Sequence, residues 1–179
     1  MTTKKPLFFY SHYEKSGDEY DSHVFSQFYL CSFVDKHGVL YCCAEQYMMA
    51  EKTRLFLKDK DNIVILAKIL GSTDPRIIKS LGRKVKNFNN DIWNKRKYEI
   101  VKEGNFFKFS QNENLKKILL NTGDMELIEA AQNDAIWGIG FLAKEALQIG
   151  REKWGENLLG KALMDVRQKI SDGENISNS

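Results

Sequence analysis

The spacing of hydrophobic and polar positions divides the chain into a β-containing start and a largely helical remainder. Short apolar runs that are typical of strands occur at 7–10, 28–34 and 39–42. The Asp35-Lys36-His37-Gly38 turn joins the last two runs, which predicts a hairpin with Gly38 as the positive-φ residue. A further short strand is favoured over 126–130.

Helical periodicity predominates from Ala44 onward. It predicts helices over 44–59, 61–70, 75–82, 90–107, 113–120, 141–149 and 156–170. Gly71 is expected to end the second helix as its C′ residue, and Asp74-Pro75 supplies an N-cap followed by a first helical residue. Asn90 or Asp91 is expected to cap the 90–107 helix.

We therefore predict a mainly α (α+β) fold, with a single compact helical domain and a small β-hairpin or sheet. The domain is expected to cover 7–170, with flexible segments at 1–6 and 171–179. No linker or internal repeat interrupts it.

Composition agrees with a single globular domain. The 179 residues are 42% hydrophobic and 28% charged, which argues against disorder. No apolar run approaches the roughly 20 residues of a membrane-spanning helix, and the polar start precedes too short an apolar run for a signal peptide. Three cysteines, two of them adjacent, do not form a disulfide framework. A cytoplasmic protein without a membrane partner is expected.

Charge is concentrated in one segment. Residues 76–108 contain ten cations and three anions, a net charge of +7, against +3 for the whole chain. Such a patch suits a phosphate-bearing ligand, and a solvated helix face explains it equally well on charge alone.

Two ionisable residues break the apolar stripe of the 44–59 helix. Met48, Met49, Leu55 and Phe56 form this stripe, but Lys52 takes its middle position. Glu45 precedes Lys52 by seven residues, so both side chains lie on one face, about 20° apart. Burying either charge costs several kcal/mol without a partner. The pair therefore indicates either a cavity-lining acid and amine or a structural ion pair whose lysine head reaches water.

A second unusual segment is Asn133-Asp134-Ala-Ile-Trp137-Gly138-Ile-Gly140. An acid, a tryptophan and two glycines suit a loop whose backbone closely approaches a ligand. The alternative is an Asx-turn beside a core tryptophan.

Trp93 and Arg83 lie in the basic segment. Trp93 is a candidate to stack on a base or to anchor its helix to the core. Arg83 follows Gly82 at a helix end, where a guanidinium would bind phosphate or remain exposed. No metal-ligand spacing, P-loop or Gly-x-Ser-x-Gly motif occurs.

In chain order these fragments resemble the NADAR (NAD- and ADP-ribose-associated) superfamily, which includes the YbiA-like N-glycosidases. The resemblance covers about 7–167. It rests on Phe9-Tyr10-Ser11, Phe25-Ser-Gln-Phe28, Ala44-Glu-Gln-Tyr-x-x-Ala-x-Lys52, Gly82-Arg83, Trp93, Asn133-Asp134-x-x-Trp137-Gly138-x-Gly140 and Gly155-x-Asn157-x-Leu159-Gly160-x-x-Leu163-Met164-x-x-Arg167.

The chain departs from the family pattern at several neighbours of these residues. Gln46 stands in place of the histidine of Ser-Glu-His-Tyr, Gln27 in place of the asparagine of Ser-Asn-Phe, and Ile139 in place of the aspartate of Trp-Gly-Asp-Gly. Gln132 also stands where an acid often precedes Asn-Asp. These departures bear on substrate choice.

The resemblance implies an N-glycosidase without metal or other cofactor that cleaves the bond between ribose C1′ and a base. It implies catalytic roles for Glu45, Lys52 and Asp134. The residues expected to bind substrate are Tyr10, Ser11, Phe28, Arg83, Trp93, Asn133, Trp137, Gly138 and Asn157. Trp93 and Trp137 would sandwich the base, Asp134 would hold ribose hydroxyls or a base edge, and Arg83 would meet phosphate.

Three functions follow as hypotheses. The first is removal of ADP-ribose from guanine in nucleic acid or nucleotide, with a genomically linked ADP-ribosyltransferase as a partner. The second is cleavage of phosphorylated ribosylaminopyrimidine intermediates of riboflavin biosynthesis, and the third is a non-catalytic ADP-ribose-binding module.

Overall fold

The computed structural model describes residues 6–14 and 16–173, which divide into two units. We call residues 30–112 the α1–α4 unit. It contains β2 (Phe33–Val34), β3 (Leu40–Tyr41), α1 (Ala44–Arg54), α2 (Asp61–Leu70), α3 (Pro75–Gly82) and α4 (Asn90–Gln111).

We call the described residues up to 29 and from 113 onward the β1–β4 unit. It contains β1 (Pro6–Phe9), α5 (Glu113–Asn121), β4 (Glu126–Glu129), α6 (Ala143–Ala146), α7 (Leu158–Ser171) and short 3₁₀ turns at Ser22–Phe25 and Arg151–Lys153. The predicted mainly α (α+β) fold class is confirmed. Of the predicted flexible ends, 1–5 and 174–179 lie outside the described residues, whereas Pro6 begins β1 and Ser171 ends α7.

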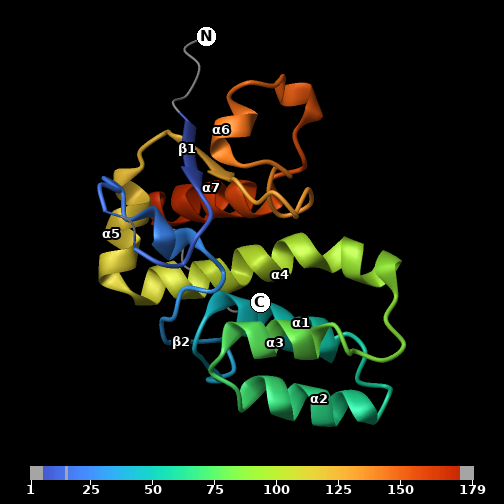
Figure 1. Cartoon of the computed structure of the whole chain (residues 1–179). Coiled ribbons are helices and arrows are strands. Elements are labelled where there is room, and N and C mark those ends of the chain that lie inside the picture. Colours follow the sequence, from blue (N-terminus) through green and yellow to red (C-terminus); the bar gives the residue numbers. More distant parts are fainter. Residues whose placement is uncertain (1–5, 15, 174–179) are drawn as a thin grey trace. The chain divides into compact units, whose positions relative to one another are not determined.

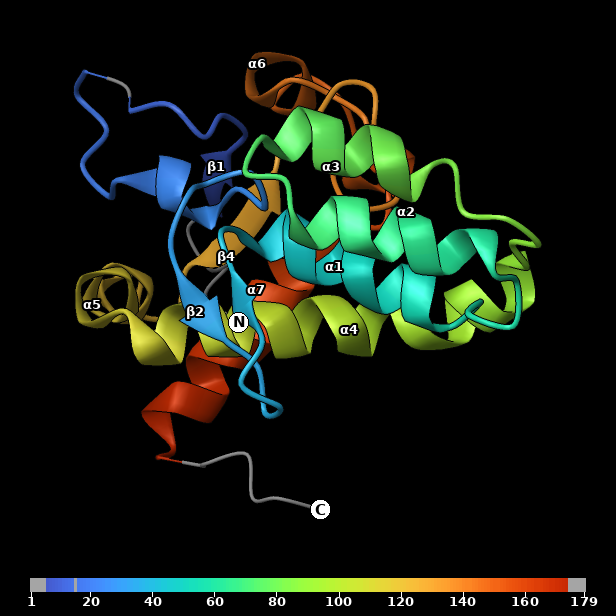
Figure 2. The same cartoon turned by 90° about the horizontal axis from the view of Figure 1, so that it is seen from below.

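Helix α1 is the central element of the α1–α4 unit. It packs against α2, α3 and α4, which surround it in Figures 1 and 2. Every residue from Ala44 to Ala50 is buried. The helix is therefore enclosed on several sides, beyond the single stripe that the sequence pattern predicted.

The hairpin of the α1–α4 unit is shorter than predicted. Phe33 pairs with Tyr41 and Val34 with Leu40 in an antiparallel arrangement, and Gly38 has the predicted positive φ of 78°. The prediction of a strand from residue 28 is wrong, because 28–32 form no strand ladder, although the Cys31 N–H donates to the Cys42 carbonyl at 2.9 Å. The Gln111 side chain of α4 instead pairs with the backbone of Val34, accepting from its N–H at 2.9 Å and donating to its carbonyl at 2.7 Å.

Several helix ends also differ from the predictions. Helix α1 ends at Arg54 rather than residue 59, because the chain tightens there, with the Phe56 N–H bonding to the Thr53 carbonyl. Asn89, rather than Asn90 or Asp91, caps α4. Its side-chain oxygen accepts from the backbone N–H groups of residues 91 and 92. Gly71 follows α2 with an ordinary helical φ of −83°, so the helix needs no left-handed residue there.

Helix α4 also extends to Gln111, four residues beyond its predicted end. In contrast, only Ala143–Ala146 of the predicted 141–149 helix is helical. The N-cap of α3 by Asp74 is confirmed, with its carboxylate accepting from the Arg76 N–H at 2.8 Å.

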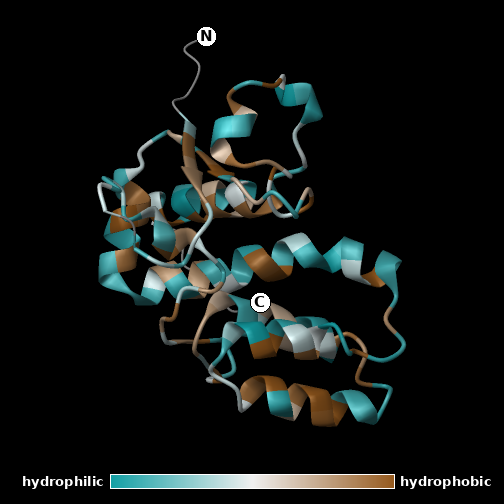
Figure 3. Ribbon diagram, in the orientation of Figure 1, coloured by the Kyte–Doolittle hydropathy of each residue, from teal (hydrophilic) through white to brown (hydrophobic). Residues whose placement is uncertain are grey.

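Helix α2 is coloured largely as apolar in Figure 3. Ile63 and Val64 are more than half exposed, while Asn62 and Ile69 are its buried residues. The apolar pattern therefore identifies the helix but not the face that it buries. Among the described residues, no helix has both the length and the apolarity needed to cross a membrane.

The core of the β1–β4 unit is a parallel pair of strands with α7 packed on β4. Leu127 and Ile128 of β4 are fully buried. Leu159, Leu163 and Val166 of α7 have exposed fractions of 1% or less. Gly160 permits this contact, since a Cβ there would lie 2.1 Å from the Leu127 carbonyl oxygen. The short strand predicted at 126–130 is thus confirmed as β4, with its end one residue earlier.

Candidate active site

Glu45 and Lys52 lie two turns apart on α1, and the negative charge of Glu45 acts on the pKa of Lys52. Glu45 is in the first turn, where the positive end of the helix dipole favours a carboxylate, and it is only 4% exposed. Lys52 is half-buried, and its Nζ donates a hydrogen bond of 3.0 Å to the carbonyl of Gly82. The lysine head is therefore held by the end of α3.

Two aromatic rings flank the Lys52 amine. Its Nζ lies 4.6 Å from the centroid of Phe88 and 5.7 Å from that of Trp93. Trp93 is 9% exposed, and Phe56 supports Phe88 with a centroid distance of 5.4 Å. The amine thus lies beside two aromatic walls, a buried Trp93 and a Phe88 that is 38% exposed.

This environment changes the acidity of Lys52. Burial lowers the pKa of Lys52; the nearby Glu45 opposes this shift, and the positive charge of Arg83 adds to it. A larger fraction of neutral amine is therefore present near neutral pH than for an exposed lysine. A neutral amine is the form that attacks a carbonyl carbon.

A glycine allows α3 to approach α1 closely enough for this contact. A Cβ on Gly82 would lie 2.1 Å from Sδ and 2.9 Å from Cγ of Met49, a buried residue of α1. Arg83 follows Gly82 and is exposed, which is one of the two alternatives that the sequence left open, beside phosphate binding.

Asn62 holds the segment between α3 and α4. Its amide donates to the carbonyls of Phe56 and Lys86 at 2.8 and 3.0 Å, and it accepts from the Lys86 N–H at 2.8 Å. This segment leads directly to Phe88, so a fully buried side chain of α2 positions one wall around Lys52.

Gln46 fixes the beginning of α1. Its Nε2 donates to the carbonyls of Ile69 and Ser72 at 3.0 and 2.9 Å, and its Oε1 accepts from the Cys42 N–H at 2.7 Å. The glutamine that departs from the family pattern therefore joins the hairpin and the end of α2 to the turn that carries Glu45.

Tyr47 joins α1 to α4. Its hydroxyl donates to Glu103 at 2.6 Å, and burial, together with that carboxylate, raises the pKa of Tyr47. Gly104 leaves room for the ring, because a Cβ there would lie 2.5 Å from its Cδ1.

Lys108 does not belong to the basic surface in which the sequence count placed it. Its side chain is fully buried, and burial lowers the pKa of Lys108 to about 8. A charge run in the sequence does not reveal this, because the last turns of α4 are buried on nearly all sides. The exposed cations of the segment are Arg76, Arg83, Lys84, Lys86, Lys95 and Arg96.

In the β1–β4 unit, Asp134 and Trp137 lie in one tight turn after β4. The Oδ1 atom of Asp134 accepts from the N–H groups of Ile136 and Trp137 at 3.0 and 2.8 Å, which forms the Asx-turn considered as an alternative. Trp137 is only partly buried, and Asn133 is exposed. The turn thus presents an indole beside a carboxylate of fixed orientation.

Backbone contacts hold this turn rigidly. The N–H groups of Asn157 and Leu159 donate to the carbonyls of Gly138 and Trp137 at 3.1 and 3.0 Å. Gly138 permits the packing, since a Cβ there would lie 2.7 Å from the Glu129 carbonyl oxygen.

Asn157 performs a positioning role in this packing. Its amide accepts from the Glu129 N–H at 3.0 Å and donates to the Leu127 carbonyl at 2.9 Å, and the residue is 8% exposed. The side chain expected to bind substrate therefore fixes β4 to the start of α7.

The N-terminal candidates lie just after β1 and beyond the first 3₁₀ turn. Tyr10 is exposed, and the Ser11 hydroxyl accepts from the Tyr13 N–H at 3.1 Å. Phe28 is partly buried, with its ring centroid 5.7 Å from that of His12. Within 6–14 and 16–173, no three His, Cys, Asp or Glu side chains gather as a metal site.

Comparison with known proteins gives this geometry its context. The NADAR domain model matches residues 8–171. The chain belongs to the NADAR domain family. Among its relatives, N-glycosidase R617 of Acanthamoeba polyphaga mimivirus is 42% identical over 174 residues, which covers 94% of this chain and 98% of the relative.

Two further relatives of the NADAR chain are informative. It is 28% identical over 169 residues to the riboflavin biosynthesis protein VVA0006 of Vibrio vulnificus, covering 94% of this chain and 40% of that protein. The NMR structure of the Escherichia coli protein YbiA matches with a TM-score of 0.72 and 25% identity, covering 99% of this chain and 94% of YbiA. YbiA and R617 are both named N-glycosidases. The family resemblance and the predicted class, a hydrolase acting on N-glycosyl compounds, are thereby confirmed.

Sequence reasoning missed the atoms that hold the candidate residues. The Gly82 carbonyl, the Phe88 ring and the Asn62 amide all act on Lys52 or its surroundings, yet none lies next to it in the sequence. The Gly82-Arg83 pair was the available signal, because a glycine within a helix often marks a close approach.

Proposed function

We propose that this NADAR protein hydrolyses the bond between ribose C1′ and guanine in ADP-ribosylated nucleic acid or nucleotide. The observation that carries the proposal is the pair on α1, a buried Glu45 whose charge acts on a half-buried Lys52 of lowered pKa. Burial beside Trp93 and Phe88 lowers the pKa of the Lys52 amine, which favours the neutral form that a reactive lysine needs.

The two side chains suit the chemistry of the C1′–N bond. As this bond breaks, positive charge develops at C1′ and the ring oxygen, and a carboxylate at close range stabilises it. Glu45 takes that role, or it accepts a proton from the attacking water. The products are a free base that has gained a proton and a ribose with a hydroxyl at C1′.

Lys52 offers a covalent alternative. After the sugar ring opens, the neutral Nζ attacks C1′ and the base leaves with a proton, so that an imine links Lys52 to the sugar. Water then adds to this imine, releases the sugar aldehyde and restores the amine. Hydrolysis with Glu45 alone gives the same products without the imine.

The remaining candidates supply recognition. In the α1–α4 unit, Trp93 beside Lys52 would stack on the base, and Arg83 would bind phosphate through its exposed guanidinium. The exposed cations of 76–96 support a ligand that carries several phosphates.

Incubation with guanine-ADP-ribosylated DNA tests this proposal. Mass spectrometry should detect free ADP-ribose and restored DNA, and the product should form far more slowly when Glu45→Gln replaces the wild-type protein. DNA that remains fully modified after incubation with folded wild-type protein would refute the substrate assignment.

A second candidate is cleavage of phosphorylated ribosylaminopyrimidines. The name of the Vibrio relative favours it, and it requires the same C1′–N chemistry. Release of ribose 5-phosphate from such an intermediate, with no action on modified DNA, would favour this function.

A non-catalytic ADP-ribose-binding module is the alternative outside enzymology. It requires that the wild-type protein turns over neither substrate and that Glu45→Gln and Lys52→Ala change only affinity.

Sodium borohydride separates the two catalytic routes. It reduces an imine to a stable adduct on Lys52, whereas hydrolysis with the carboxylate alone gives no such adduct.

A further inference from the structure

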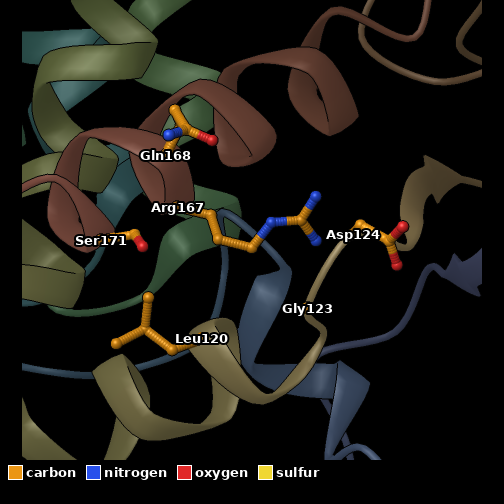
Figure 4. A pocket seen from close by; sticks show the side chains of 6 residues that line it. All are labelled: Leu120, Gly123, Asp124, Arg167, Gln168 and Ser171. Carbon is orange, nitrogen blue, oxygen red and sulfur yellow. The ribbon is translucent and has the colours of Figure 1, made fainter.

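The β1–β4 unit contains a pocket of about 310 Å³ between the end of α5 and the last turns of α7 (Figure 4). Its lining residues are Leu120, Gly123, Asp124, Arg167, Gln168 and Ser171. Apart from Leu120 and Gly123, they all carry polar side chains. The pocket therefore has the composition of a polar ligand site rather than of an unfilled core.

A buried guanidinium lines this pocket. Arg167 is only 8% exposed, and its Nη1 donates to the Thr122 hydroxyl at 2.6 Å. Its other donors have no hydrogen-bond partner among the described residues. None of the ion pairs formed by residues 6–14 and 16–173 includes Arg167.

This arrangement leaves positive charge incompletely compensated. Burial lowers the pKa of Arg167, and the charge of Asp124 opposes this shift. Figure 4 shows the guanidinium extending toward Asp124 across the pocket. Asp124 itself is exposed, so water screens much of its effect. A buried guanidinium with available donors is an efficient binder of planar or tetrahedral oxyanions.

We propose that this pocket binds a small oxyanion, a phosphate or carboxylate group, with Arg167 as the residue that binds it. The Ser171 hydroxyl lines the same space and would add a hydrogen bond, whereas the Gln168 amide already donates to Asp172 at 2.8 Å. Asp124 would limit affinity for strongly charged anions and would favour a ligand with a hydroxyl or amine beside its anionic group.

The pocket lies away from the turn that carries Asp134 and Trp137. Asp124 precedes β4, whereas that turn follows it. Arg167 lies ten residues beyond Asn157 along α7, which corresponds to about 15 Å of helix. The two sites therefore occupy opposite ends of the same two elements, and the oxyanion site does not depend on the proposed function.

Titration of the isotopically labelled full chain with inorganic phosphate, and separately with acetate, tests the proposal at constant ionic strength. The amide signals of Gly123, Asp124 and Ser171 should shift in a saturable manner with at least one of the two. Saturation with phosphate alone identifies a phosphoryl ligand, and saturation with acetate alone identifies a carboxylate.

Two variants connect the signal to the pocket. Arg167→Lys should weaken binding by about tenfold, because the two-pronged contact is lost. Asp124→Asn should strengthen it by about fivefold, because a like charge is removed at close range. Lys161→Gln is the matched control, an exposed cation of α7 that does not line the pocket, and it should leave binding unchanged.

The absence of saturable shifts with both anions would overturn the proposal. Equal binding by wild-type, Asp124→Asn and Lys161→Gln proteins would also overturn it, and this comparison holds even where an Arg167 variant does not fold.

Discussion

Replacement of Gly82 by alanine perturbs the contact that holds Lys52. The new Cβ would lie 2.1 Å from Sδ, 2.9 Å from Cγ and 3.2 Å from Cβ of Met49. Because three atoms along one buried side chain are involved, a rotation of its terminal methyl group does not relieve the overlap. Either Met49 leaves its position or the end of α3 moves away from α1.

The magnitude follows from two opposing effects. Overpacking a buried contact costs about 1–3 kcal/mol. An alanine in place of glycine near a helix end returns up to about 1 kcal/mol by restricting the unfolded chain. We expect the free energy of unfolding of Gly82→Ala to fall by roughly 0.5–2 kcal/mol, as measured by urea denaturation.

Activity should fall more than stability suggests. Movement of α3 displaces the carbonyl that accepts from Lys52 Nζ at 3.0 Å. Misplacement of a reactive group by about 1 Å can reduce turnover by about a hundredfold. We therefore expect the turnover of the folded Gly82→Ala protein to fall by about ten- to a hundredfold.

A double-mutant cycle identifies the cause. Met49→Ala alone should cost about 2–5 kcal/mol, because it opens a cavity in the core. Combined with Gly82→Ala, it should cost less than the two single effects together by about 1–3 kcal/mol, since the new methyl occupies part of that space. Ser80→Ala, at an exposed position of α3, is the control. A Gly82→Ala protein that is as stable and as active as wild type would refute the close-approach argument.

Three further predictions concern other charged or strained residues. Between pH 8 and 10.5 the unfolded chain keeps the proton that Lys108, with its pKa of about 8, has released in the folded state. The free energy of unfolding of the wild-type protein therefore rises with pH in this range. Lys108→Met, which has no charge to bury, should be more stable than wild type at pH 8, and this difference should shrink by up to about 3 kcal/mol toward pH 10.5. A difference that stays constant with pH would contradict this. Asn157→Ala should cost about 2–4 kcal/mol, because both amide hydrogen bonds are lost and alanine is placed at a φ of 51°. Asn157→Gly should be more stable than Asn157→Ala by about 1 kcal/mol, because glycine adopts this φ without strain. Equal urea midpoints for these two variants would contradict the backbone contribution. Since the positive charge of Arg83 lowers the pKa of Lys52, Arg83→Gln should move the pH midpoint of borohydride trapping upward, and a midpoint unchanged or lower would contradict it.

The sequence was informative where local spacing determines geometry. The seven-residue separation of Glu45 and Lys52 placed them on one face of α1, and the Asx-turn at Asp134 follows from residue type and position. The Asp74 cap of α3 and the positive φ of Gly38 were predictable for the same reason.

Predictions were wrong where tertiary packing decides. The 28–34 run is apolar enough for a strand, but only Phe33 and Val34 find pairing partners in β3. Lys108 was counted with surface cations, although the surrounding helix turns bury it completely. The Asn157 amide bonds to the backbone of β4, which the sequence did not indicate, and its part in substrate binding stays a prediction. Each outcome depends on an element distant in the sequence.

The most direct test of the central claim, that the acid and the amine of α1 carry the reaction, is the turnover of Glu45→Gln. This change keeps the size of the buried side chain and removes its charge. The control is Glu51→Gln on the same helix, whose partner is Arg54 rather than Lys52. We predict that Glu45→Gln releases ADP-ribose from modified guanine at least about a hundredfold more slowly, while Glu51→Gln stays close to wild type. A folded Glu45→Gln protein with wild-type turnover would contradict the account.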